Sequence, residues 1–232
     1  MSLGNASGDS SSIREDRHPT GITILDEEEL KGIPEGSTIA VLGDADSASE
    51  MILHSLAATG RQTEYISTLR PEYGLLGDIK RARQDDVDAE TVEQKVTIRD
   101  TVKDADSFGD VLRRSMKIVE DGNLIIDSFS KMHDKPREMM DLARRVQRKT
   151  SKQGGITYLY FVASDVDQLS RNEREILQMV DGVFNVKTQI VGTDTIENNL
   201  FINKLRGVDI PDDAQNIVFG ERITIDVTAD IG

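Results

Sequence analysis

Three carboxylates follow a short apolar run in the segment VLGDADSASE, residues 41–50. Asp44, Asp46 and Glu50 come directly after Gly43, where the apolar run gives way to a helical pattern. A glycine between a strand and a helix is a setting in which backbone N–H groups hold phosphate. Carboxylates repel phosphate, so the residue types oppose the chemistry that the setting suggests.

Two other interpretations of this loop need no phosphate. A calcium loop requires glycine at its sixth position and glutamate at its twelfth, where this chain has Ser49 and Ser55, so the calcium interpretation fails. In the structural interpretation, Asp46 or Ser47 caps the following helix, and Glu50 in the first turn interacts favourably with the helix dipole. This interpretation stays open beside that of an altered phosphate loop.

Two more sets of charged residues lie at or near the ends of apolar runs. Asp127 closes the run NLIIDS, residues 123–128, where it can hydrogen-bond the first loop or cap a neighbouring helix. Lys204 and Arg206 are two residues apart in an expected strand and therefore share one face of it. Such a pair can bind acidic groups on the protein's own surface.

Composition excludes several classes of function. The net charge of −14 opposes the phosphate attraction on which nucleic-acid affinity depends, so a free-standing nucleic-acid binder is not expected. There is no cysteine for a disulfide, a thiolate metal site or a cysteine nucleophile. No pair among His18, His54 and His133 has a metal-ligand spacing, and we predict no metal site. No apolar run could span a bilayer, and we expect no membrane association and a cytoplasmic location.

The pattern of apolar residues then gives the elements that must position these side chains. Residues 1–19 are rich in Ser, Gly and Asp and predict a disordered tail, and residues 20–232 predict one folded domain. Strands and helices alternate up to about residue 182, after which antiparallel ribbons follow. The expected strands are 38–42, 63–67, 95–100, 123–128 and 156–164, with ribbons over 183–191, 199–207 and 216–227. The expected helices are 49–60, 75–86, 107–122, 136–155 and 172–182.

The order of four segments is more specific than the fold class. GIPEGSTIAVLG, NLIIDSFSKM, MVDGVFNV and NKLRG follow one another along the chain. In these segments the sequence resembles the RecA/KaiC-like P-loop ATPases, and among them the single-domain archaeal KaiC relatives. The resemblance implies a three-layer αβα fold, with a mostly parallel central sheet and antiparallel strands at its C-terminal edge. The excess of Asp over other acids, with few aromatics, is similar to proteins of salt-accumulating archaea.

The resemblance also implies roles for individual residues. The family loop has the form G-x-x-x-x-G-K-[ST], whose lysine reaches the outer phosphates and whose hydroxyl holds Mg²⁺. Starting from Gly43, its second glycine falls on Ala48, its lysine on Ser49 and its hydroxyl on Glu50, so only the first glycine is kept. This is a degenerate Walker A loop.

Outside the loop, three residues match other positions of the family's ATPase site. Asp127 falls on the family's carboxylate that helps to hold Mg²⁺. Lys204 and Arg206 fall on a pair that, in KaiC-like rings, reaches the nucleotide of the neighbouring subunit. The resemblance therefore implies that the residues which reach a neighbouring subunit, Lys204 and Arg206, match the family better than the nucleotide-binding loop at residues 43–50 does.

These expectations lead to one function and two alternatives. We expect a catalytically inactive RecA/KaiC-like domain that acts as a regulatory or signalling protein through protein association, with no cofactor. The first alternative is a slow or unconventional ATPase that binds Mg-ATP or Mg-ADP. The second is a subunit of a mixed ring that completes the active site of a competent KaiC-like ATPase, and a homo-oligomer is a further possible assembly.

Overall fold

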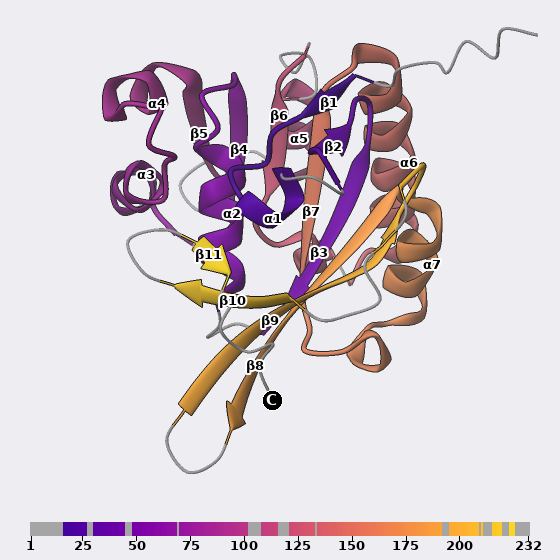
Figure 1. The fold of residues 1–232 in the computed structure, drawn as a ribbon. Coiled ribbons are helices and arrows are strands. Elements are labelled where there is room, and N and C mark those ends of the chain that lie inside the picture. The colour runs from indigo at the N-terminus through magenta and orange to yellow at the C-terminus, as the bar shows by residue number, and fades with distance from the viewer. Residues whose placement is uncertain are drawn as a thin grey trace, which may run out of the picture.

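The computed structural model describes residues 16–26, 30–44, 48–68, 70–101, 108–115, 121–132, 134–191, 195–208, 210, 215–219 and 223–225. Its main sheet contains the strands β3 Thr38–Gly43, β4 Thr63–Ser67, β5 Val96–Asp100, β6 Asn123–Ile126, β7 Ile156–Val162, β8 Gly182–Val191, β9 Thr195–Leu205, β10 Gln215–Phe219 and β11 Ile223–Ile225. Across this sheet the order is β11-β10-β9-β8-β3-β7-β6-β4-β5 (Figure 1).

Strand direction divides this sheet into two parts. The strands from β8 to β5 in the spatial order all run parallel to one another. β9, β10 and β11 continue the sheet as antiparallel neighbours beside β8. The predicted α/β class, with a parallel centre and antiparallel strands at the C-terminal edge, is confirmed.

Helices cover both faces of the parallel part (Figure 1). One buried apolar cluster includes residues of α1, α2, α3 and α4, and a second includes residues of α5, α6 and α7 on the opposite face. The helices are α1 Thr23–Asp26, α2 Ser49–Ala57, α3 Glu72–Arg81, α4 Ala89–Lys95, α5 Phe108–Ser115, α6 Pro136–Gln153 and α7 Arg171–Met179, with short 3-10 helices η1 Phe129–Met132 and η2 Val166–Gln168. This is a three-layer αβα arrangement.

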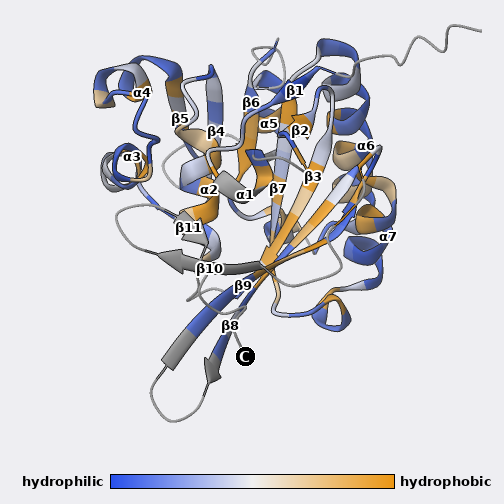
Figure 2. Cartoon of the chain, viewed as in Figure 1, coloured by the Kyte–Doolittle hydropathy of each residue, from blue (hydrophilic) through white to orange (hydrophobic). Residues whose placement is uncertain are grey.

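The central strands are apolar on both sides because helices lie above and below them. In β3, Ile39 and Val41 belong to the cluster under α2, whereas Ala40 and Leu42 belong to the cluster under α6. All four side chains are fully buried. Figure 2 shows the result, with hydrophobic central strands and hydrophilic outer helices.

The folded part begins earlier than the predicted boundary at residue 20. Arg17 and His18 form β1, which pairs with β2 at Ile33–Pro34. Gly32 permits this pairing because its φ is +88° and a Cβ at this position would lie 2.4 Å from the His18 carbonyl oxygen. The composition of the first nineteen residues concealed this short pairing, and residues 1–15 lie outside the described part of the chain.

The connection from β4 to β5 also differs from the prediction. The helix expected over 75–86 begins after Pro71 as α3, and α4 was not predicted. Asp88 caps α4, since its carboxylate accepts the Thr91 N–H at 2.6 Å. α4 has only one buried residue, Val92, so its sequence shows no helical periodicity of apolar residues.

The helices α5 and α6, on the other face of the sheet, lie close to their expected positions. α6 stops at Gly154, whose φ of +76° continues the chain in the left-handed region after the last turn. α5 covers the first part of the helix expected over 107–122, and residues 116–120 lie outside the described part. Within the described residues, no helix is both long and apolar enough to cross a membrane.

The core under α6 offers a direct test of this packing. Phe161 is fully buried and meets Phe129 edge to face, with ring centroids 5.8 Å apart. Replacing Phe161 with alanine should lower the free energy of unfolding by about 3–5 kcal/mol, because it leaves a cavity in the centre of the sheet. Urea denaturation measures the loss. Tyr73→Ala is the control, since Tyr73 is 95% exposed and should change stability by less than about 0.5 kcal/mol. Equal losses would contradict the described packing.

Candidate functional site

The helix α2 begins after Ala48. Ala48 occupies the N-cap position and makes no side-chain cap hydrogen bond. The expected cap by Asp46 or Ser47 is therefore not at the N-cap position, and both residues lie outside the described part of the chain. Glu50 lies in the first turn of α2, as expected.

Ser49 stands where the resemblance places a lysine, and it is turned into the protein. Its side chain is fully buried, and its hydroxyl donates to the Asp44 carbonyl oxygen at 3.1 Å. The same hydroxyl lies 2.9 Å from the hydroxyl of Tyr160 on β7. Ser49 thus binds the backbone of its own loop and a neighbouring strand.

Tyr160 holds the end of β3 in the same way. Its hydroxyl lies 3.0 Å from the Gly43 carbonyl oxygen and 3.2 Å from that of Asp44. Burial raises the pKa of Tyr160 to about 12, so the hydroxyl keeps its proton and remains a donor. The sequence analysis did not select Tyr160, because it lies within an almost continuous apolar run.

Glu50 stands where the resemblance places the hydroxyl that holds Mg²⁺, and it forms an ion pair instead. Its carboxylate lies 3.3 Å from the guanidinium of Arg70, and the two side chains are each 37% exposed. Arg70 also binds Asp78 on α3. An ion pair this exposed contributes about 0–1 kcal/mol, but it occupies the carboxylate and links α2 to α3.

Asp127 lies just after β6 and is bound by the end of β4. One carboxylate oxygen accepts the Thr68 N–H at 2.8 Å and the Thr68 hydroxyl at 2.9 Å. The other accepts the Ser67 hydroxyl at 2.9 Å. Burial raises the pKa of Asp127, and these hydrogen bonds and the charge of Lys131 oppose the increase. Asp127 was expected to hydrogen-bond the first loop or to cap a neighbouring helix, but these hydrogen bonds go to Ser67 and Thr68 at the end of β4.

The structure brings Glu50 and Asp127 together. Both line a small cavity with room for about one water molecule. The other lining residues are His54, Tyr65, Arg70 and Leu75. Two residues that are 77 positions apart in the sequence therefore line one small cavity.

Lys204 and Arg206 lie at the other end of the parallel strands. The Lys204 ammonium donates to the carbonyl oxygens of Gln178, at 3.0 Å, and Val180, where α7 ends. Arg206 is one residue past β9, so it does not share the strand as predicted. Its guanidinium lies 2.9 Å from the carboxylate of Asp181.

The position of Asp181 fixes the edge at which this pair lies. Asp181 accepts the Thr38 N–H at 3.0 Å, at the amino end of β3. The loop at Gly43 is at the carboxyl end of the same strand, roughly 16 Å away for five strand residues. Within one chain, Lys204 and Arg206 therefore do not reach the loop. No group of three or more His, Asp and Glu side chains in the described residues could hold a metal ion.

Comparison with known proteins gives a family and a fold. A family model described as a family of unknown function (DUF7125) matches residues 17–232. The structure is similar to the crystal structure of the KaiC-like protein PH0186 from the hyperthermophilic archaeon Pyrococcus horikoshii OT3, with a TM-score of 0.71 and 20% sequence identity. This match covers 90% of the present chain and 98% of the other. No curated protein matches the sequence significantly.

The hydrogen bonds of Asp127 can be tested by two substitutions. Asp127→Ala leaves the N–H and hydroxyl of Thr68 without their acceptor and should lower the free energy of unfolding by roughly 1–3 kcal/mol. Asp127→Asn keeps an acceptor oxygen in the same place and should cost clearly less. Urea denaturation of both variants at neutral pH gives the comparison. Equal losses would show that the acceptor oxygen is not what Asp127 contributes.

His54 predicts a pH dependence of stability. Burial lowers its pKa from the ordinary 6.5 to about 4, so the folded protein keeps the imidazole neutral. Stability is therefore full above pH 6.5 and falls, on the order of 3 kcal/mol in total, as the pH decreases through 4. Unfolding measured from pH 7.5 to 4.5 should show a smaller slope for His54→Leu than for the wild type. Parallel slopes would mean that His54 titrates normally.

Proposed function

Because the chain belongs to this family of unknown function, whose description assigns no activity, we propose a function from the site itself. The protein is a RecA/KaiC-like domain that does not hydrolyse ATP and that regulates or signals through association with other proteins. The observation that carries this proposal is the buried hydroxyl of Ser49, which is hydrogen-bonded to Tyr160 and Asp44 where a phosphate-binding loop needs a cation.

Electrostatics at the loop supports the proposal. Phosphoryl transfer depends on cations that neutralise the charge of the outer phosphates. Among the described residues at this loop, Asp44 and Glu50 carry carboxylates, and the nearby guanidinium of Arg70 is shared between Glu50 and Asp78. These carboxylates would repel a triphosphate, and this supports the interpretation of residues 43–50 as a degenerate Walker A loop.

The state of Asp127 supports the same conclusion. A carboxylate that holds Mg²⁺ directly or through water needs open space on its metal side. Here both oxygens accept hydrogen bonds from Ser67 and Thr68, and the adjoining cavity has room for about one water molecule. Asp127 in this setting joins β6 to β4 and has a structural role.

The alternative of a mixed ring receives less support. The Arg206 side chain is 69% exposed and could reach a neighbour, but it is paired with Asp181. The ammonium of Lys204 is bonded to two carbonyl oxygens at the end of α7. Both cations therefore have a role inside the chain that needs no neighbouring nucleotide.

Nucleotide binding and turnover test the proposal. We expect no change in melting temperature with Mg-ATP or Mg-ADP up to millimolar concentrations, at low or molar KCl, and no ATP turnover above background. A ligand present at 100 times its Kd would stabilise the protein by about 2.7 kcal/mol, which a melting experiment detects easily. Turnover that is present in the wild type and lost in Asp127→Asn would contradict the proposal and favour a slow ATPase, because the matched variant excludes a contaminating enzyme.

A further inference from the structure

The outer side of α6 carries a run of cations on an acidic protein. The chain has a net charge of −14, but residues 144–152 contain five basic residues and no acidic one. Arg144 lies 3.9 Å from the carboxylate of Asp141. The other four are spaced i, i+3, i+4 and i+7 and therefore lie on one side of the helix. This basic face consists of Arg145, Arg148, Lys149 and Lys152, all exposed except the half-buried Lys149.

The fold itself does not explain the charge of the basic face. Within the described residues, no ion pair joins its four cations to an acidic side chain. Like charges three and four residues apart destabilise a helix. The helix dipole favours cations in the last turn, where Lys152 alone of the four lies. The basic face therefore lowers the stability of α6, and its cations are available to a group from outside the chain.

The side chains of the basic face surround a hollow of about 480 Å³. Its lining consists of these four cations and Gln153, without any carboxylate. From Arg145 to Lys152 the basic face extends about 10 Å along the helix axis, because each residue adds about 1.5 Å. Guanidinium and ammonium groups form charge-assisted hydrogen bonds with carboxylates, and a guanidinium can hold one carboxylate through two such bonds. The hollow therefore suits a short row of carboxylates.

Acidic groups limit the length of this row. A second hollow, of about 750 Å³, shares Arg148 and Lys152 with the first and is also lined by Asp16 and Glu35. Carboxylates of a ligand that reached these two residues would be repelled. In the other direction along α6, Asp141 precedes the basic face. The basic face is thus bounded by acids and suits a short acidic ligand better than a long polyanion.

From this arrangement we propose that the basic face binds a short acidic peptide segment of another protein. The inference rests on the proposed function, because it names a surface and a partner chemistry for a domain that acts through protein association. Arg145 and Lys149 are separated by about 6 Å along the helix axis. Carboxylates on alternate residues of an extended segment are separated by about 6.6 Å and match this spacing.

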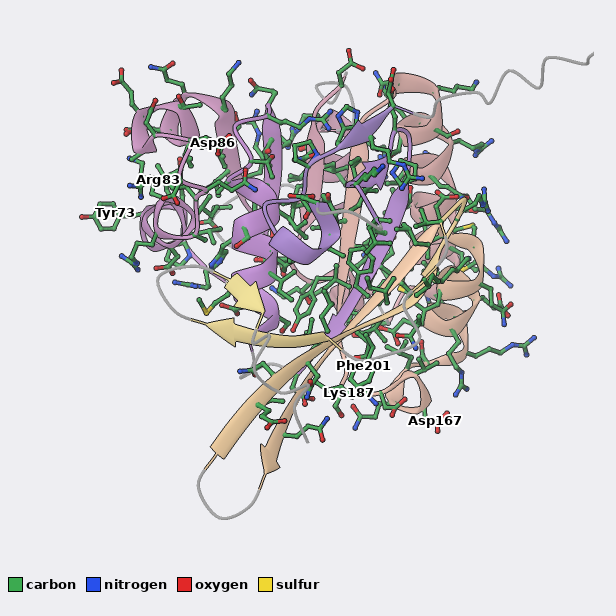
Figure 3. All side chains as sticks on the ribbon, viewed as in Figure 1. Tyr73, Arg83, Asp86, Asp167, Lys187 and Phe201 are labelled. Atoms are coloured by element: carbon green, nitrogen blue, oxygen red, sulfur yellow. The ribbon has the colours of Figure 1, made fainter. Side chains whose placement is uncertain are left out.

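Two other polyanions fit the basic face less well. A nucleic acid would extend past it, over a protein whose net charge of −14 repels phosphate. A helix that binds a membrane surface buries apolar side chains in the lipid, whereas the apolar side of α6 packs on the sheet (Figure 2). The exposed large apolar side chains of the described residues, Tyr73 and Val162, are not on α6. In Figure 3 Tyr73 lies at the far left, and α6 is on the right in the same view of Figure 1.

Peptide binding to the full chain tests the proposal. The probe is a short fluorescein-labelled peptide of alternating Glu and Ala, followed by fluorescence anisotropy, and a peptide of alternating Gln and Ala is the neutral control. Arg145→Glu/Arg148→Glu reverses two charges of the basic face. At low KCl the wild type should bind the Glu peptide, and this variant should bind it at least about tenfold more weakly. Affinity should decrease towards molar KCl, because salt screens exposed charges.

A matched control variant separates the basic face from net charge. Arg83→Glu/Lys95→Glu changes the net charge by the same amount, at two exposed residues next to α3 and on α4, which cover the opposite face of the sheet. Figure 3 labels Arg83 on the left, away from α6. This variant should bind the Glu peptide within about twofold of the wild type, since long-range repulsion between the peptide and the protein rises equally in both variants. Circular dichroism melts establish that both variants are folded.

Several results would overturn the proposal. These are a wild type that does not bind the Glu peptide, an equal loss of binding in both variants, and equal binding of the Gln peptide. Anionic phospholipid vesicles or a DNA duplex that bind more tightly than the Glu peptide, and that Arg145→Glu/Arg148→Glu no longer binds, would also overturn it. No nucleotide takes part in these measurements, so ATP turnover would contradict the proposed function and leave the peptide result unchanged.

Discussion

The common direction of the strands from β8 to β5 decides which polar residues of this protein meet. Parallel strands bring their carboxyl ends to one edge of the sheet. Gly43 lies at this edge, and Thr68 and Asp127 become neighbours there although they are far apart in the sequence. The same direction places Thr38 and Asp181 at the opposite edge, where Asp181 accepts the Thr38 N–H and pairs with Arg206. The loop after Gly43 and the cation Arg206 therefore lie at opposite edges of the sheet because the strands run parallel.

Most strand positions could be predicted from the sequence, and with them the edge of the sheet at which Gly43 and Asp127 lie. The residues that occupy the site could not. Tyr160 lies in a run of apolar residues, and its role depends on the register in which Val41 faces Tyr160 across β3 and β7. Arg70 follows β4 in a connection without periodicity, and its pairing with Glu50 needs the packing of α3 beside α2. Such contacts are set by tertiary structure.

Hydrogen bonding at the loop edge follows the general rule that buried polar groups find partners. Ser49, Tyr160 and Asp127 all do so inside the chain, through backbone carbonyls, backbone N–H groups and hydroxyls. In a phosphate-binding site some of these donors would be kept for a ligand. The same fold can therefore use these donors to bind a ligand or to bond other groups of the chain.

The buried contact of Ser49 with Tyr160 limits what a substitution at position 49 can achieve. A lysine at position 49 alone would place an ammonium in a fully buried position against the tyrosine hydroxyl. A buried cation without a carboxylate partner destabilises a protein. A cation could therefore be introduced at this position only together with changes in Tyr160 or in the loop backbone that Tyr160 binds.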